Sequence, residues 1–169
     1  MKGQYVSVPV ASGGHFQAYL ATSVDSRGPG LVLCQEIFGV NQAMREVADL
    51  LAEEGYTVLV PDLYWRQEPG VELGYTEADF ARAYALYQGF NEALGIDDIR
   101  ASLKALETLP QCIAGDLGVV GYCLGGKLAY LAACRLPEVA CAVGYYGVGI
   151  ENALSEIEGL QGRLVLHMA

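Results

Sequence analysis

The 169-residue sequence has few basic residues. Ten lysines and arginines stand against twenty aspartates and glutamates, which gives a formal net charge of −10 at pH 7. A strongly acidic chain repels phosphate groups at long range, so this balance argues against nucleic acid and anionic membrane surfaces as partners. For the same reason, an anionic small-molecule substrate would need a local cation to bind.

The sequence also lacks a long apolar run, and we find no export signal in it. No uninterrupted apolar stretch reaches membrane-spanning length, and the N-terminal residues MKGQYVSVPV lack the apolar core of a signal peptide. Five cysteines are present, an odd number, and no C-x-x-C pair occurs. We therefore expect no disulfide framework, metal site or cofactor, and a location in the reducing cytoplasm.

Apolar residues, in contrast, are abundant. They make up 53% of the chain, and a sheet buried on both faces explains such a high share. A chain of this length suits one domain with a substantial core. Three of the cysteines, Cys34, Cys134 and Cys141, lie within apolar strand or helix patterns, and we expect them to be buried and inert.

Short apolar runs alternate with helical patterns along the chain. Runs at residues 5–8 and 16–20 predict an N-terminal hairpin, and further strands are expected at 30–34, 57–60, 117–120, 139–143 and 163–168. Helices are expected from the N-cap Asn41 to Gly55, at 77–90 and 96–109, from the turn at 121–125 to about 135, and at 151–157. This alternation predicts one α/β domain with a doubly wound, mostly parallel sheet.

The most informative stretch is LGVVGYCLGGKLAY, residues 117–130. An apolar strand pattern leads into Gly121-Tyr122-Cys123-Leu124-Gly125, and a helix-compatible run follows. This is the G-x-S-x-G nucleophile elbow with Cys in place of Ser. The two glycines fit because a Cβ at either position would strike the neighbouring backbone. Cys123 would then lie at a helix N-terminus, where N–H groups and the helix dipole favour a thiolate and an adjacent oxyanion.

Two other interpretations of this stretch need consideration. A cysteine between strand and helix is commonly only a small buried hydrophobe, although glycines on both sides favour a nucleophile. Residues 121–127 also match the G-x-x-x-x-G-K pattern of a phosphate-binding loop. Leu128 stands where that loop needs Ser or Thr for magnesium, so we reject this interpretation.

A second candidate segment is Gln35 to Gly39. It follows a predicted strand directly and precedes a helix cap. Ligands of doubly wound sheets bind beyond the carboxyl ends of the strands, so we expect this segment to line the same crevice as Cys123. Position alone leaves Glu36 either an ordinary loop carboxylate or a functional one. Four tyrosines are further candidates for this crevice, although each alone is more commonly a packing residue: Tyr64, Tyr84, Tyr145 and Tyr146.

Four blocks of the sequence together resemble the dienelactone hydrolase family. They are QEIFGVN at 35–41, PDLYWRQEPG at 61–70, GYCLGG at 121–126 and VGYYGVG at 143–149. The resemblance covers nearly the whole chain in one order and spacing. It implies an α/β-hydrolase fold, a Cys-His-Asp triad, and the opening of a cyclic dienelactone ester to maleylacetate during the degradation of aromatic compounds.

The resemblance also implies roles for individual residues. Cys123 would be the nucleophile, and Glu36 would be the carboxylate that pairs with the thiol and takes its proton when substrate enters. The backbone N–H groups of Ile37 and Leu124 would form the oxyanion hole. The expected substrate-binding residues are Phe38, Arg82, Tyr84 and Tyr145.

Arg82 departs from the family pattern. The family holds the substrate carboxylate with arginines, and Arg82 lies one or two positions from the expected register. Such a shift on a helix turns the side chain by about 100° to 200°. A solvated surface arginine is therefore an equally valid interpretation, and with it the substrate would differ from the namesake of the family.

The end of the sequence is the second departure. Residues 163–168 predict a strand that in this fold leads to the loops carrying the triad Asp and His. The two histidines present, His15 and His167, lie in the hairpin and at a strand end, and we give neither a triad role. We therefore interpret the chain as a single α/β-hydrolase domain that is incomplete at its C-terminus, with the remaining segment on another chain or absent.

Three functions remain open from the sequence. The first is a cytoplasmic hydrolase that opens a small anionic lactone or ester with a cysteine nucleophile. The second is a related thiol carboxylesterase that acts on another small ester. The third is a non-catalytic fragment or binding module that lacks the triad His and Asp.

Overall fold

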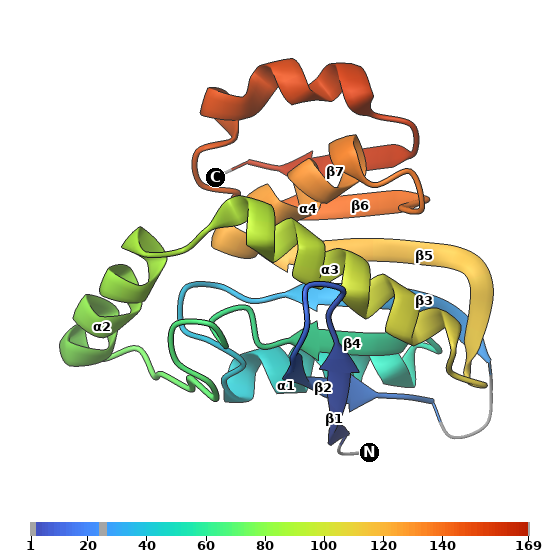
Figure 1. Cartoon of the computed structure of the whole chain (residues 1–169), viewed down its shortest axis with the longest axis horizontal. Coiled ribbons are helices and arrows are strands. Elements are labelled where there is room, and N and C mark those ends of the chain that lie inside the picture. The colour runs from blue at the N-terminus through green and yellow to red at the C-terminus, as the bar shows by residue number, and fades with distance from the viewer. Residues whose placement is uncertain (1–2, 24–26, 169) are drawn as a thin grey trace.

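A computed structural model, described here for residues 3–23 and 27–168, contains a seven-stranded sheet with helices on both faces (Figure 1). The strand order is β1-β2-β4-β3-β5-β6-β7. Strand β2 runs antiparallel to both of its neighbours, β1 and β4, and the five strands β3 to β7 run parallel to one another. The strands are β1 (Gln4–Pro9), β2 (His15–Ala21), β3 (Gly28–Cys34), β4 (Thr57–Pro61), β5 (Cys112–Tyr122), β6 (Cys141–Tyr145) and β7 (Arg163–His167). The predicted fold class is confirmed.

The helices cover the two faces of the sheet unequally. They are α1 (Gln42–Glu53), α2 (Glu77–Gln88), α3 (Glu92–Glu107), α4 (Leu124–Arg135) and the 3-10 helix η1 (Ile150–Gly159). Helices α3 and α4 share one apolar core with Val32 and Cys34 of β3, while α1 shares the other with Leu31 and Leu33. Because successive strand residues point to opposite faces, α1 lies on the face opposite to α3 and α4. On its face α1 packs chiefly on β2 and β4.

Helix α1 begins where the sequence predicts it. The Oδ1 atom of Asn41 accepts a hydrogen bond from the backbone N–H of Met44 at 3.2 Å, which caps the first turn. Helix α3, in contrast, begins at Glu92 and not at Ile96 as predicted. The side chain of Asn91 caps it by accepting from the N–H of Leu94 at 3.1 Å, and Gly95 lies inside the first turns.

Strand β6 also differs from the prediction of a strand at 139–143 that breaks at Gly144. It begins at Cys141 and continues through Tyr145, and Gly144 pairs in register with Gly121 on β5. A Cβ on Gly144 would lie 2.7 Å from the carbonyl oxygen of Gly126. This glycine therefore serves the close packing of α4 on the sheet and makes no turn.

The burial predicted for the cysteines is correct for Cys34 and Cys134 and wrong for Cys141, which is exposed. Its neighbours Ala142 and Gly144 are buried, so Cys141 points to the other face of β6. Helix α1 packs mainly on β2 and β4, which leaves that part of the sheet more open. Among the described residues, no helix has both the length and the apolar character that a membrane span needs.

Candidate active site

Cys123 lies at the tip of a sharp turn between β5 and α4. Strand β5 ends at Tyr122 and α4 begins at Leu124, so one residue connects them. Cys123 has φ 55° and ψ −114°. Apart from glycines, Cys123 and Tyr146 are the residues with positive φ in the described part of the chain. Such strain persists only where the surrounding structure enforces it, and it is common at functional sites.

The glycines around Cys123 leave no room for side chains. A Cβ on Gly121 would lie 2.0 Å from the carbonyl oxygen of Gly125, and one on Gly125 would lie 2.3 Å from that of Cys34. A Cβ on Gly126 would lie 2.5 Å from the carbonyl oxygen of Tyr145. All of these obstacles are backbone atoms, which cannot move aside as flexible side chains can. The turn therefore depends on these glycines, as the sequence pattern predicts.

The surroundings of the Cys123 thiol raise its pKa. Burial is the largest cause, a hydrogen bond from the backbone N–H of Leu124 acts in the opposite direction, and the negative charge of Glu36 raises the pKa further. The N–H at the helix N-terminus thus lowers the pKa of the thiol, which is the direction the sequence predicts, but desolvation outweighs it. A neutral thiol is a weak nucleophile, so the predicted nucleophilic role of Cys123 would require a base.

Glu36 lies in the same site as Cys123, at the carboxyl edge of the sheet. The charge of Glu36 acts on the pKa of the thiol, as noted above. The hydrogen bonds of its carboxylate, however, go to two phenols. Tyr146 donates to Oε1 at 3.1 Å, and Tyr75 donates to Oε2 at 3.3 Å. The structure thus brings Glu36 and Cys123 together and engages both carboxylate oxygens elsewhere.

The two backbone segments expected to form the oxyanion hole are joined to each other. The N–H of Gly125, in the first turn of α4, donates to the carbonyl oxygen of Gln35 at 3.0 Å. The side-chain Oε1 of Gln35 accepts from the N–H of Leu63 at 3.2 Å, which fixes this segment from the other side. Ile37 and Leu124, whose N–H groups are the predicted donors, lie next to these anchored residues, and their catalytic role remains a prediction.

A row of aromatic rings extends from this site toward α2. The ring of Phe38 lies 4.8 Å from that of Tyr75 and 6.4 Å from that of Phe80. The ring of Tyr84 stacks on Phe80 with centroids 6.4 Å apart and lies 6.1 Å from that of Tyr87. Tyr75, Phe80 and Tyr84 are exposed. Two predicted substrate-binding residues, Phe38 and Tyr84, thus belong to one accessible aromatic surface.

Arg82 has a different position. It forms an ion pair with Glu68, and both side chains are about half exposed. Phe80 and Tyr84 are four residues apart and share one face of α2, whereas Arg82, two residues from each, points about 160° away from them. The structure therefore does not bring Arg82 into the aromatic row, and its role in substrate binding remains a prediction.

Tyr145 lies in a stack of rings across three parallel strands. Its ring packs between Tyr122, at 4.9 Å and 13°, and His167, at 4.6 Å and 6°. These three residues are paired in register on β5, β6 and β7. His167 thus packs against an aromatic ring, which agrees with giving it no triad role. The next residue, Tyr146, is the one whose hydroxyl reaches Glu36.

Sequence reasoning missed Tyr75 and named Tyr146 only as one of four tyrosines. Both follow the carboxyl end of a parallel strand, β6 for Tyr146 and β4 for the loop that carries Tyr75. That placement is the signal that pointed to Glu36. The sequence does not reveal that Glu36 and Tyr146 form a hydrogen bond, because 110 residues separate them.

Two cavities lie away from this site. One, of about 850 Å³, lies between β1 and α3 and is bordered by Val8, Ala101 and Lys104. The other, of about 410 Å³, is bordered by His15, Trp65 and Val71. Neither Cys123 nor Glu36 borders them. The candidate active site is therefore identified by its chemistry and strained geometry and not by cavity size.

Comparison with solved structures identifies the fold. The chain superposes on a putative dienelactone hydrolase from Klebsiella pneumoniae with a TM-score of 0.77 and 23% identity, covering 98% of this chain and 84% of that one. It superposes on the dienelactone hydrolase-like promiscuous phosphotriesterase P91 from metagenomic libraries with a TM-score of 0.71 and 16% identity, covering 100% and 82%. At these identities, the matches show the fold alone.

Comparison of sequences identifies the family. The chain is 41% identical over 164 residues to a carboxymethylenebutenolidase of Pseudomonas sp. (strain P51), covering 96% of this chain and 68% of that protein. It is 39% identical to a carboxymethylenebutenolidase of Pseudomonas putida, covering 96% and 69%. The sequence model of the dienelactone hydrolase family matches residues 16–169. The chain thus belongs to the dienelactone hydrolase family and is a carboxylic ester hydrolase.

Proposed function

We propose that this chain carries the nucleophile of a thiol-dependent hydrolase that opens a small cyclic ester, converting a dienelactone to maleylacetate. The observation that carries this proposal is the strained position of Cys123 at the N-terminus of α4, next to the charge of Glu36. The relatives named carboxymethylenebutenolidase support the substrate class. The odd number of cysteines and the lack of a C-x-x-C pair support a cytoplasmic location.

The reaction begins with a proton transfer. When substrate enters, Glu36 takes the proton of the Cys123 thiol, and the sulfur attacks the ester carbonyl carbon to form a tetrahedral oxyanion. The backbone N–H groups of Ile37 and Leu124 stabilise this oxyanion, an effect worth about 3 kcal/mol per donor. Collapse breaks the bond to the ring oxygen, which leaves as an enolate, and forms a thioester on Cys123. Glu36 then passes its proton to the enolate, which becomes the ketone, and the carboxylate is ionised again. Water then hydrolyses the thioester and regenerates the thiol.

Hydrolysis of the thioester calls for a general base, and the family resemblance assigns this role to a His held by an Asp. We propose that this pair lies on a segment beyond residue 169 or on another chain. The relative from strain P51 supports this proposal because this chain covers 68% of its length. The rest of that relative lies outside the matched region.

Substitutions at the nucleophile and the base test the proposal. Cys123→Ala is expected to abolish dienelactone turnover, and Glu36→Gln to reduce kcat/KM by at least tenfold, because proton transfer contributes about 10²- to 10⁴-fold in such reactions. Since the charge of Glu36 raises the pKa of Cys123, Glu36→Gln should lower that pKa in the free protein while it slows turnover. The exposed Cys141, changed to Ser, serves as the matched control. Turnover retained by Cys123→Ala would overturn the proposal.

A second candidate function is a thiol carboxylesterase for uncharged aromatic esters. It is favoured by the pairing of Arg82 with Glu68 and by the exposed rings of Phe80 and Tyr84. The kcat/KM values for dienelactone and for a neutral aryl ester distinguish the two candidates. If Arg82 binds the substrate carboxylate, Arg82→Gln lowers only the value for dienelactone. If both values stay unchanged and the aryl ester is the better substrate, the second candidate is correct.

A further inference from the structure

We propose that Tyr75 and Tyr146 are positioning residues that hold the Glu36 carboxylate away from the Cys123 thiol until substrate displaces it. This inference rests on the proposed function, in which Glu36 serves as the base for the thiol. We refer to the two tyrosines together as the phenol clamp. The clamp controls the reaction through position: the phenols hold the carboxylate where its hydrogen bonds go to Tyr75 and Tyr146, and the carboxylate has to move before it can accept the proton of the thiol.

The first argument is the hydrogen bonding of Glu36. Tyr146 donates to Oε1 at 3.1 Å and Tyr75 to Oε2 at 3.3 Å, so each carboxylate oxygen has its own phenol. The two tyrosines come from separate parts of the chain, the loop after β4 and the end of β6. A carboxylate bonded at both oxygens from two sides is restrained in rotation as well as in position. The Glu36 carboxylate is therefore held in place by contacts that form only in the folded protein.

The second argument is the backbone of Tyr146. Its φ of 40° lies in the left-handed region, which it shares with Cys123 among the non-glycine residues described. The N–H of Tyr146 donates to the carbonyl oxygen of His167 at 2.7 Å, which holds this conformation. This region is a strained backbone conformation for a residue with a bulky side chain. This strain turns the chain so that the Tyr146 hydroxyl reaches Glu36.

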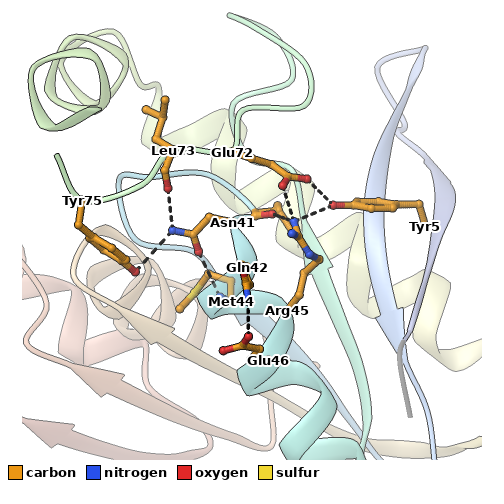
Figure 2. Close-up of polar contacts among 10 residues, drawn as sticks. Tyr5, Asn41, Gln42, Met44, Arg45, Glu46, Glu72, Leu73 and Tyr75 are labelled. Carbon is orange, nitrogen blue, oxygen red and sulfur yellow. Dashed lines mark hydrogen bonds and ion pairs between the residues drawn. The ribbon is translucent and has the colours of Figure 1, made fainter. Parts of the chain in front are cut away.

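The third argument is the anchoring of Tyr75, shown in Figure 2. Asn41, the N-cap of α1, donates through Nδ2 to the carbonyl oxygen of Leu73 at 3.0 Å and lies 3.5 Å from the hydroxyl of Tyr75. Glu72, the residue before Leu73, forms an ion pair with Arg45 of α1 at 2.7 Å. The N–H of Leu73 donates to the carbonyl oxygen of Phe38 at 2.9 Å. The segment that carries Tyr75 is therefore fastened to the segment that follows Glu36.

The groups around the thiol explain why the position of Glu36 matters. Its charge acts on Cys123, Tyr122 and Tyr146, and it bonds to Tyr75, while the buried Tyr64 also faces Cys123. In this set, Glu36 is the charged group. If the clamp is lost, the carboxylate can accept a hydrogen bond from the thiol. A closer negative charge and a bond to the neutral thiol both raise the pKa of the sulfur.

The test measures the pH dependence of Cys123 alkylation by iodoacetamide, with the modified peptide quantified by mass spectrometry. Tyr75→Phe and Tyr146→Phe are each expected to raise the pKa of Cys123 by about half a unit to one unit, which slows alkylation at pH 7.5 about three- to tenfold. Both side chains are exposed, at 63% for Tyr75 and 42% for Tyr146, so we expect the fold to tolerate loss of either hydroxyl. Tyr56→Phe, at the opposite edge of the sheet, is the matched control.

A double-mutant cycle isolates the role of Glu36. In a Glu36→Gln background, the same tyrosine changes are expected to shift the alkylation profile by less than about 0.2 pH units, since no carboxylate remains to be released. A pKa that falls or does not move in the single variants, or that shifts equally in the Gln background, would overturn the clamp. This readout needs no ester. Turnover retained by Cys123→Ala therefore refutes the proposed function separately from the clamp.

Discussion

The elbow around Cys123 and the aromatic surface of α2 form two sides of one site and are held in opposite ways. Helix α4, which follows Cys123, is buried at nearly every position, and its glycines contact backbone atoms of β3 and β6. In α2, Ala83 is the buried residue, and the aromatic rings lie on an exposed face. Close packing thus fixes the position of Cys123, the proposed nucleophile, whereas the aromatic rings proposed to contact substrate are held by ring contacts that can change at small energetic cost.

This contrast separates residues that determine whether the site exists from residues that determine what it accepts. At the elbow, a Cβ added to a glycine would lie within 3 Å of backbone atoms, so these positions do not tolerate a side chain. The exposed rings on α2, in contrast, can be substituted with little loss of stability. We therefore expect changes in the elbow to reduce folding and turnover together, and changes on α2 to affect substrate preference alone.

The largest effect is expected from Gly121→Ala. The added Cβ would lie 2.0 Å from the carbonyl oxygen of Gly125, so the turn must deform, at a cost of about 3 kcal/mol in unfolding free energy. Urea denaturation measures this loss. Gly115→Ala is the control, because nothing lies within 4 Å of that Cβ and only the positive φ of 86° is penalised. Equal losses in the two variants would show that the close approach at Gly121 costs no more than the positive φ at Gly115, which would contradict this prediction.

The smallest effect on stability is expected from Phe80→Ala. The side chain is 55% exposed, so its removal should change the unfolding free energy by less than about 1 kcal/mol. The same change breaks the aromatic row between Phe38 and Tyr84, and we expect the KM for aryl esters to rise severalfold with kcat nearly unchanged. A loss of stability as large as that of Gly121→Ala would end the distinction between the two sides of the site.

The elbow was predictable from the sequence because its determinants are local. The strand pattern, the glycines at positions 121 and 125 and the helix pattern lie within a few residues of Cys123, and each has a steric reason. Glu36 was predictable in place from the rule that ligands bind at the carboxyl edge of a parallel sheet. The N-cap Asn41 was predictable from its residue type and position before an apolar helical pattern.

The features that were missed depend on distant parts of the chain. The partners of Glu36 come from residues 75 and 146, and no local pattern pairs them with position 36. The exposure of Cys141 depends on which strands α1 covers. The apolar pattern of β6 holds no information about the position of that helix. The early start of α3 is the local exception, because Asn91 caps the helix and Gly95 lies within it.

The central claim is that Cys123 is set apart from the other four cysteines by its strained turn and by its access to Glu36. The most direct measurement treats the protein with one equivalent of 4-nitrophenyl acetate and locates the acetyl group by peptide mass spectrometry. We predict a single acetyl thioester on Cys123, formed at least tenfold more slowly in Glu36→Gln. Acetylation spread over all accessible cysteines, or of exposed Cys141 in preference to Cys123, would contradict the account.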